Sequence, residues 1–538
     1  TATNLIPGAF TTFTVTFNPS RIGTRTAQFT ITSNDLNETT FEIPLTGVGS
    51  VGRDLLADGP LATDSWAVAY SGVDAPATPR NGVANAVVVQ HSTTADEAVA
   101  VFATGHTTNA AGNKDLYVMK YDPNSGAEMW PAPVIVDGGV GRDDEGLAIA
   151  VDGSGNVVVA GYQTVSLNNT DVYVAKFNGA SGSLIWSKTY SGAGGGLDAA
   201  VSLALDPSGN VAVAGYGRNG AGNQDVFMAR YLADGTEVFA YLVDGGASRT
   251  DGANTVATDA AGSVYAAGYR NVAAGNKDCY IIKLNSTGDF LWERTIAGTS
   301  VTTGSDDEVY SMALDATGNP VLGGTLYNST GYDLFAAKLS AVDGSTTWQR
   351  SENPYSFNDS FRNVLVDRNG DIVMAGVSHT TATTTVRYVS KYTTDGVLVW
   401  NARLNTANST SGNLWTGGIA LDGEENVVVT GFSVNGGGTR DVYTAKLKHR
   451  DGSQLWERIY DGGVAGGAND EGRAVASSLD GYVYVAGYAG VDGGTTAFLL
   501  KHYKPVTAPV QTPQTITFPA LAEQGVGGQV NLVATATS

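Results

Sequence analysis

The sequence predicts an all-β fold, an eight-bladed β-propeller with seven blades as the alternative, and partial β-sandwich segments at both ends. Three observations support the propeller. A large aromatic residue recurs every 52 to 64 residues, a glycine lies four residues before each aromatic from the second onward, and short strand-like runs alternate with tight turns. Self-similarity with a period of roughly 50 residues is typical of propellers and other repeat arrays. The recurring aromatics are Trp66, Trp130, Trp186, Phe239, Trp292, Trp348, Trp400 and Trp456.

One copy of the repeat contains four short strands, at 147–152, 156–162, 171–177 and 183–190. Their alternating pattern and their Val, Ile and Tyr content favour strand over helix. The first two are separated by the turn "DGSGN", whose aspartate can accept backbone N–H groups and whose glycine permits a positive φ. A four-stranded antiparallel unit repeated about an axis is a propeller blade.

Two further positions recur in most copies, which indicates a scaffold role, because a site for one ligand must break the symmetry of the ring. A basic residue ends the third strand and an aspartate ends the first strand, on the same rim. We therefore expect pairs exposed on that rim, each contributing about 0–1 kcal/mol. The eighth copy has Ser478 in the aspartate position, so Lys501 is expected to lack this partner. The basic residues are Lys120, Lys176, Arg230, Lys283, Lys338, Lys391, Lys446 and Lys501, and the aspartates are Asp152, Asp206, Asp259, Asp315, Asp367 and Asp422.

The number of strands of each type predicts how the ring closes. The strand that ends in glycine and the strand that ends in the basic residue each occur eight times. The first tryptophan strand, at 64–70, precedes all the others, and none follows the last lysine strand at 496–503. We therefore expect 64–70 to be the outer strand of the last blade, in a propeller that spans 63–504.

The two ends of the chain have a different pattern. Residues 1–50 contain three strand-like runs and predict the end of an immunoglobulin-like β-sandwich, followed by a linker at 51–62. A Pro/Thr-rich linker at 505–514 precedes two strand-like runs in 515–538, which predict the start of a further immunoglobulin-like module. We expect the chain to be a slice of a longer multidomain protein, and to be monomeric.

The repeat resembles a known family. The unit "DGSGNVVVAGY…DVYVAKF…GSLIW" resembles the bacterial secreted β-propeller repeat called SBBP, and "DPNSGAEMW" (122–130) resembles the tryptophan-docking motif of PQQ-type quinoprotein propellers. The first 49 residues resemble the end of a choice-of-anchor D module, and "QTITFPALAEQ" resembles the start of another bacterial surface immunoglobulin-like module. Together these resemblances imply a secreted or cell-surface bacterial protein.

Composition narrows the possible partners. The net charge of −21 disfavours nucleic acid and anionic membrane surfaces, since phosphate binding needs an excess of Lys and Arg. No apolar run approaches the roughly 18 residues of a membrane span. The single cysteine, Cys279, excludes an internal disulfide and is expected to be a buried, inert thiol.

A second set of aspartates stands eight residues before the first-strand aspartate. We expect it near one mouth of the central channel, where each inter-blade loop enters the innermost strand. One interpretation is that each carboxylate accepts backbone N–H groups from the loop. The other is a collar that binds cations, with Ca²⁺ as the candidate cofactor, at a site assembled across blades because no EF-hand spacing is present. This collar consists of Asp144, Asp198, Asp251, Asp307, Asp359 and Asp470.

The collar is broken in the seventh copy, which reads "SGNLWTGG" at 411–418. Leu414 stands in the aspartate position, and the next residue, Trp415, is the only one of the eight tryptophans outside the docking motif. Trp415 is therefore a candidate ligand-binding residue, because unique large aromatics near a pocket mouth often anchor ligands. The alternative is that Leu414 and Trp415 plug the channel.

The residues do not favour an enzyme. A single cysteine cannot supply the adjacent pair that many alcohol-oxidising quinoproteins place beside their cofactor, and the five histidines have no metal-ligand spacing. We expect a non-catalytic extracellular scaffold, binding or adhesion module whose partner is an extracellular protein or a glycan. The alternative is a carbohydrate-binding or carbohydrate-active propeller, which a unique cluster of acids and aromatics on the long-loop face would favour.

Overall fold

The computed structural model describes residues 23–32, 40–49, 65–70, 81–502, 516–517 and 535–536. Within 81–502 it leaves out 95, 110, 140, 245–248, 274–275, 300–305, 329–330, 355–357, 382–383, 405–414, 436–437, 463–467 and 492–493. The chain divides into two units, Leu61–Lys504, and Thr1–Pro60 together with Pro505–Ser538. The described residues contain strands but no helix, and so none of them forms a helix long and apolar enough to cross a membrane.

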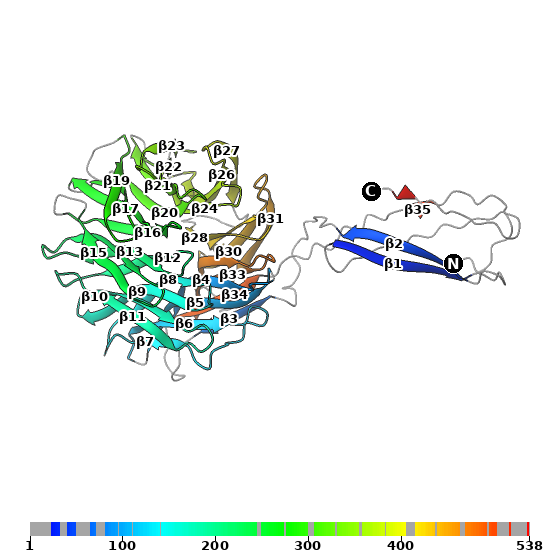
Figure 1. The fold of residues 1–538 in the computed structure, drawn as a ribbon, viewed down its shortest axis with the longest axis horizontal. Coiled ribbons are helices and arrows are strands. Elements are labelled where there is room, and N and C mark those ends of the chain that lie inside the picture. The colour runs from blue at the N-terminus through cyan, green and yellow to red at the C-terminus, as the bar shows by residue number, and fades with distance from the viewer. Residues whose placement is uncertain are drawn as a thin grey trace, which may run out of the picture. The chain divides into compact units, whose positions relative to one another are not determined.

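The unit Leu61–Lys504 is an eight-bladed propeller of four-stranded antiparallel sheets (Figure 1). From the innermost to the outermost strand, the first four blades are β4 (Val83–His91), β5 (Ala98–Thr108), β6 (Lys114–Tyr121) and β7 (Val134–Val136); β8 (Glu145–Val151), β9 (Val157–Ser166), β10 (Asn169–Phe177) and β11 (Leu184–Tyr190); β12 (Ala199–Leu205), β13 (Val211–Arg218), β14 (Gln224–Tyr231) and β15 (Glu237–Val243); β16 (Gly252–Thr258), β17 (Val264–Ala273), β18 (Asn276–Leu284) and β19 (Phe290–Ile296).

In the same order, blades 5 to 8 are β20 (Glu308–Leu314), β21 (Pro320–Asn328), β22 (Gly331–Leu339) and β23 (Thr346–Glu352); β24 (Asp359–Val366), β25 (Ile372–His379), β26 (Thr385–Tyr392) and β27 (Leu398–Leu404); β28 (Trp415–Leu421), β29 (Val427–Val434), β30 (Arg440–Leu447) and β31 (Gln454–Tyr460); β32 (Glu471–Ser477), β33 (Val483–Val491), β34 (Gly494–His502) and β3 (Trp66–Tyr70).

The eighth blade combines strands from both ends of the propeller, as the strand count predicts. β3 is antiparallel to β34 and pairs Trp66 with Lys501 and Tyr70 with Ala497. In Figure 1 the blue β3 lies beside β34, whose colour marks the other end of the propeller. The prediction of eight blades is confirmed, and the seven-bladed alternative is wrong because the described strands of this unit form eight four-stranded sheets.

The flanking unit has two described pairs of strands. β1 (Gly23–Thr32) pairs with β2 (Thr40–Gly49), and β35 (Ile516–Thr517) pairs with β36 (Thr535–Ala536), both antiparallel. The first of the three strand-like runs expected in 1–50 lies outside the described residues. The two immunoglobulin-like modules therefore stay predictions.

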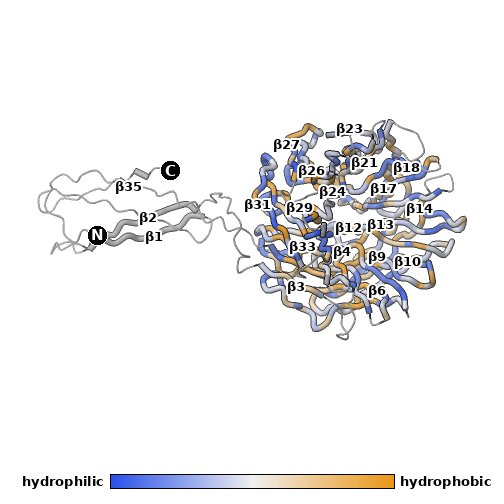
Figure 2. The backbone as a smooth tube through the Cα atoms, turned by 180° about the vertical axis from the view of Figure 1, so that it is seen from behind, coloured by the Kyte–Doolittle hydropathy of each residue, from blue (hydrophilic) through white to orange (hydrophobic). Residues whose placement is uncertain are grey.

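The core of the propeller lies between blades rather than in one centre. Each of eight hydrophobic clusters joins two neighbouring blades, and one of them joins blade 8 to blade 1 through Tyr484 and Tyr117. Hydrophobic and hydrophilic stretches consequently alternate around the whole ring (Figure 2). Except at its rims, each blade is covered on one face by the preceding sheet and on the other by the following sheet. Burial on both faces explains the nearly continuous Val-rich second strands.

The recurring tryptophans dock each blade onto the next, as expected of a scaffold position. The Nε1–H of Trp292 donates to the carbonyl oxygen of Ala341 in the following blade at 3.1 Å, and Lys283 donates to the same oxygen at 2.9 Å. Gly344, with φ of 68°, lies against the indole, and a Cβ there would meet it at 2.6 Å. The other docked pairs are Trp66–Gly126, Trp130–Gly182, Trp186–Gly235, Phe239–Gly288, Trp348–Gly396 and Trp400–Gly452.

The basic residue and the first-strand aspartate do pair, but the expectation of an exposed rim is wrong. Lys338 Nζ lies 2.8 Å from Asp315 Oδ2, and both side chains are more than nine-tenths buried. The other oxygen of Asp315 accepts the turn N–H groups of Thr317 and Asn319. The turn of the next blade, which receives the tryptophan, covers the pair. In blade 8, Lys501 instead lies 3.9 Å from the ring centroid of Tyr482.

The same arrangement is repeated in five further blades, in the pairs Lys176–Asp152, Arg230–Asp206, Lys283–Asp259, Lys391–Asp367 and Lys446–Asp422.

Candidate binding site on the loop face

We call loop face the end of the propeller at which each segment from the preceding blade leads into the innermost strand. Every innermost strand has a β-bulge near this end, for example between Gly146 and Ala148. The bulge brings the carbonyl oxygen of Glu145 to within 1.9 Å of where a Cβ of Gly161 would lie. That close approach is why the second strand needs glycine at this point, and it places the residue after the glycine on the loop face.

Two residues of each blade meet across this pairing. The first, which we call the start residue, is the first residue of the innermost strand, except in β24, where it is the second. The second, which we call the facing residue, follows the strand glycine. The pairs are Val83–His106, Glu145–Tyr162, Ala199–Tyr216, Gly252–Tyr269, Glu308–Thr325, Ser360–Val377, Trp415–Phe432 and Glu471–Tyr488. Unlike the tryptophan and lysine positions, the start position differs chemically from blade to blade, whereas the facing position is aromatic in five of the eight blades.

Each predicted collar aspartate lies one residue before the start residue of its blade, and all six aspartates are buried. Asp144 Oδ2 accepts the N–H of Gly138 at 2.5 Å, and its Oδ1 accepts the N–H of Thr164 at 2.7 Å. Each carboxylate thus fastens an inter-blade loop or the end of the second strand, which is the backbone-binding interpretation. Equivalent N–H groups reach Asp198, Asp251, Asp307, Asp359 and Asp470.

Burial determines the ionisation of these carboxyls. It raises the pKa of Asp307 and Asp359 to about 6, against the stabilising effect of the N–H groups that they accept. Burial also raises the pKa of Asp144, Asp198 and Asp470 above the ordinary aspartate value.

Three collar aspartates belong to closer groups of acids, which we call the aspartate triads. Each triad has three members: a collar aspartate, the aspartate at the start of the preceding blade's third strand, and an exposed aspartate after the outer strand of that preceding blade. One carboxylate oxygen of each member lies within 4.8 Å of those of the other two. Burial and the nearby Asp137 raise the pKa of Asp115 to about 6. Oxygen-only groups of this kind suit Ca²⁺, and the cation site stays a prediction. The triads are Asp115–Asp137–Asp144, Asp225–Asp244–Asp251 and Asp441–Asp461–Asp470.

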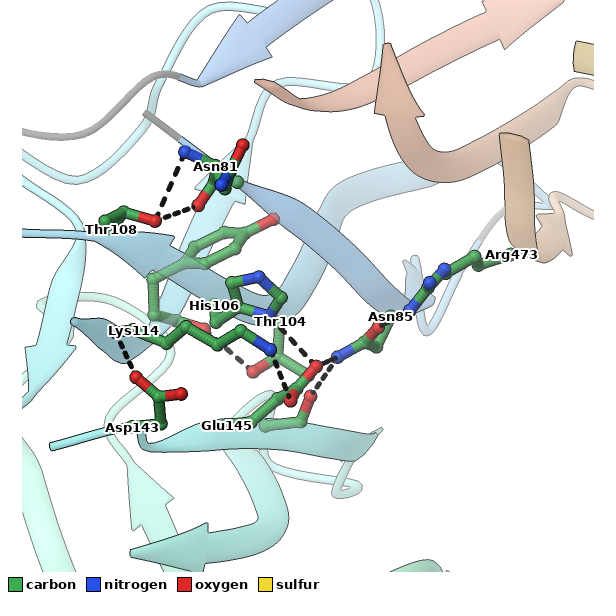
Figure 3. A network of polar contacts seen from close by, with 12 residues as sticks. Asn81, Asn85, Thr104, His106, Thr108, Lys114, Asp143, Glu145 and Arg473 are labelled. Carbon is green, nitrogen blue, oxygen red and sulfur yellow. Dashed lines mark hydrogen bonds and ion pairs between the residues drawn. The ribbon is translucent and has the colours of Figure 1, made fainter. Parts of the chain in front are cut away.

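A polar network on the loop face joins blades 8, 1 and 2 (Figure 3). Glu145 accepts hydrogen bonds from Asn85 Nδ2 at 2.7 Å and from Tyr162 Oη at 3.0 Å, and it lies 2.9 Å from His106 Nδ1. Arg473 of blade 8 donates to Asn85 Oδ1 at 2.8 Å. Despite burial, the hydrogen bond and charge of His106 and the bond from Asn85 lower the pKa of Glu145 to about 2. Glu145 is therefore a fixed carboxylate.

Blade 8 repeats part of this arrangement. Tyr488 Oη donates to Glu471 Oε2 at 2.9 Å, and Arg440 Nη1 lies 3.5 Å from the same oxygen. Asn254 of blade 4 likewise donates to Glu308 Oε1 of blade 5 at 2.8 Å. A glutamate in the start position thus collects donors from its own blade and from the preceding one.

The start position is small in blades 3 and 4, where Ala199 and Gly252 replace the glutamate. The hydroxyls of their facing residues, Tyr216 and Tyr269, make no hydrogen bond within the part of the chain that the structure describes, and both side chains are partly exposed. The ring of Tyr269 lies over Gly252, where a Cβ would meet Tyr269 Oη at 3.1 Å.

Sequence reasoning missed the start and facing residues, although a signal for them exists. An aromatic follows the strand glycine at Tyr162, Tyr216, Tyr269, Phe432 and Tyr488. The predicted ligand residue Trp415 begins β28 and pairs with Phe432, but its side chain lies outside the described residues, as does Leu414.

These features define a β-propeller whose repeated positions fasten the blades and whose variable positions gather on the loop face. The family described as "Domain of unknown function (DUF5122) beta-propeller" matches residues 207–236, which include β13 and β14 of blade 3. No curated protein matches the chain.

Three solved structures match over most of their length at low identity. Sqt1 from Chaetomium thermophilum is 11% identical with a TM-score of 0.49, over 79% of this chain and 96% of that one. Quinohemoprotein alcohol dehydrogenase from Comamonas testosteroni is 12% identical with a TM-score of 0.43, over 86% and 79% of the two chains. The RRP9 WD40 repeats are 10% identical with a TM-score of 0.42, over 68% and 96%.

Proposed function

We propose that the propeller is a non-catalytic binding module of a secreted or cell-surface bacterial protein, and that it recognises an extracellular partner at its loop face. One observation carries this proposal. The tryptophan, glycine, lysine and aspartate positions repeat from blade to blade and bond to one another, whereas the start residues of the loop face differ and so change the partners of the facing residues. Recognition of a single ligand requires such asymmetry, and the scaffold positions lack it.

The state of Glu145 supports binding rather than catalysis. A general acid or base needs a pKa near the working pH. The pKa of Glu145 is lowered to about 2, and its oxygens are already occupied by His106, Asn85 and Tyr162. Such a carboxylate orients its neighbours and presents a fixed negative charge. The resemblance to secreted bacterial repeats supports the extracellular location.

The proposal is tested with the full chain, labelled and applied to arrays of extracellular-matrix proteins and of oligosaccharides. Val201 is a bulge residue on the loop face, between Ala200 and Ser202, and Ser154 lies in the turn at the opposite end of blade 2. We expect Val201→Arg to abolish the binding that the arrays detect and Ser154→Arg to leave it unchanged.

The same oligosaccharides, incubated with the protein and assayed for new reducing ends, should remain intact. Binding lost only in Ser154→Arg would place the site on the opposite end of the propeller, where the turns between the first and second strands lie. Release of reducing ends would refute the non-catalytic role.

A further inference from the structure

The facing tyrosines provide an internal comparison between occupied and unoccupied hydroxyls. In blades 2 and 8 the tyrosine hydroxyl is bonded to the glutamate of its own blade, Tyr162 to Glu145 and Tyr488 to Glu471. In blades 3 and 4 the glutamate is replaced by Ala199 and Gly252. The two substitutions fall in neighbouring blades, so the unsatisfied hydroxyls lie next to each other rather than at scattered points of the ring.

Tyr216 is the centre of this arrangement. It is the facing residue of blade 3, and the facing residues of the two neighbouring blades, Tyr162 and Tyr269, are also tyrosines. Both the start residue of its own blade and that of the next blade are small, so no side chain in either start position can reach its hydroxyl. Because the side chain is partly exposed and makes no hydrogen bond within the described residues, its hydroxyl can bond to a polar group of a ligand.

Charges close this arc of tyrosines at both ends. Glu145, the start residue of blade 2, marks one end, and Glu308, the start residue of blade 5, marks the other. Lys277 Nζ lies 4.0 Å from the ring centroid of Tyr269 and covers part of the ring. The arc therefore offers two phenol hydroxyls and an aromatic surface, with an ammonium group beside them and a glutamate that is already hydrogen-bonded at each end.

We propose that the loop face of blades 2 to 4, centred on Tyr216 and Tyr269, binds a carbohydrate. A sugar presents several hydroxyls that both donate and accept, which matches the hydroxyls of two phenols in neighbouring blades. Its C–H faces suit the partly exposed rings. The chain's net charge of −21 and the two flanking glutamates select neutral or amino sugars over sulfated and uronic-acid polymers. This inference rests on the proposed function and specifies its ligand.

Removal of single hydroxyls tests the site without disturbing the fold. The full chain is titrated by calorimetry with short oligosaccharides of chitin, mannan, cellulose and xylan. We expect at least one of them to bind, and Tyr216→Phe and Tyr269→Phe each to raise its Kd by about 3- to 10-fold, the effect of one lost hydrogen bond. The matched control is Tyr488→Phe, in the same position across the ring, where the hydroxyl is already bonded to Glu471. It should change Kd by less than about twofold.

A second variant gives blade 3 the start residue of blades 2, 5 and 8. Ala199→Glu should occupy the hydroxyl of Tyr216 and abolish sugar binding. Because Ala199 is buried, thermal unfolding is measured beside binding, so that lost binding in a folded variant is told apart from lost fold.

Each other outcome refutes a different step. If none of the sugars binds but a protein on the array does, and Val201→Arg abolishes that binding, the carbohydrate is wrong and the binding module stands. If a sugar binds and the three tyrosine variants weaken it equally or not at all, the site is not this arc. If nothing on either array binds, both proposals fail.

Discussion

Substitution of Lys338 by methionine tests whether the buried ion pairs hold the blades. Lys338 Nζ lies 2.8 Å from Asp315 Oδ2 and 2.7 Å from Thr394 Oγ1 of the next blade. Methionine keeps most of the side-chain volume but removes the charge, which leaves the Asp315 carboxylate buried without its cation. The bond to Lys338 is among the causes that lower the pKa of Asp315 well below its usual range.

The expected loss in the free energy of unfolding is about 3 kcal/mol. Breaking a buried ion pair by removing one partner typically costs about 3–5 kcal/mol. The lower end applies here, because Thr317 and Asn319 continue to donate hydrogen bonds to Asp315. The loss should shrink below the ordinary aspartate pKa, where protonation of Asp315 removes the unpaired charge.

Blade 1 supplies the matched control. Lys120 occupies the same position as Lys338, but it donates to the carbonyl of Gly179 at 2.8 Å and lies over the Phe102 ring. Burial lowers the pKa of Lys120. Its two contacts are a carbonyl oxygen and an aromatic ring, so removing its charge leaves no unpaired carboxylate behind. Lys120→Met should cost only about 1 kcal/mol. Urea unfolding at neutral pH measures both variants. Equal losses would refute the reasoning and assign the stabilisation to packing of the lysine stems.

Three further predictions concern the docking glycines, the buried carboxyls and the triads. Gly344→Ala should cost about 2–4 kcal/mol in thermal unfolding, because φ is 68° and a Cβ would meet Trp292. Gly153→Ala should be nearly neutral, because a Cβ there meets nothing within 4 Å. Similar costs for the two variants would contradict the docking geometry. The pKa of the Asp359 carboxyl rises from 3.8 to about 6 on folding, so its ionisation destabilises the fold as pH rises through that range. The free energy of unfolding of Asp359→Asn should therefore increase by about 2–3 kcal/mol relative to that of the parent between pH 4 and 7. A difference between the two proteins that does not change with pH would refute this prediction. Free Ca²⁺ at tenfold its Kd should add about 1.4 kcal/mol for each triad that binds it; identical melting curves in millimolar Ca²⁺ and in EDTA would leave the carboxylates a purely structural role.

The scaffold could be predicted because its signals repeat. Eight strands of each type, a docking aromatic such as Trp292 and a glycine such as Gly344 define both the blade and the closure of the ring. The burial of Lys338 and Asp315 could not be read from their own segments, because the turn that covers them belongs to the next blade.

The loop face was harder to predict for a related reason. The contact between Arg473 and Asn85 joins residues 388 positions apart. The hydroxyls of Tyr216 and Tyr269 lack a glutamate partner because the start residues of their blades are Ala199 and Gly252, which carry no chemical signal of their own. An alignment of the eight repeats around each strand glycine would have shown both replacements, but not which hydroxyls they leave unbonded.

The closure of the ring through β3 has a mechanical consequence. The chain comes into the propeller before Trp66 and leaves it after Lys501, and these two residues face each other at the same end of the β3–β34 pair. Tension applied through the flanking segments would therefore open this pair like a zipper, breaking its hydrogen bonds one after another rather than all at once. Blade 8 would yield first and at low force, and the freed edge of β34 would become available to another strand while the other seven sheets stay intact.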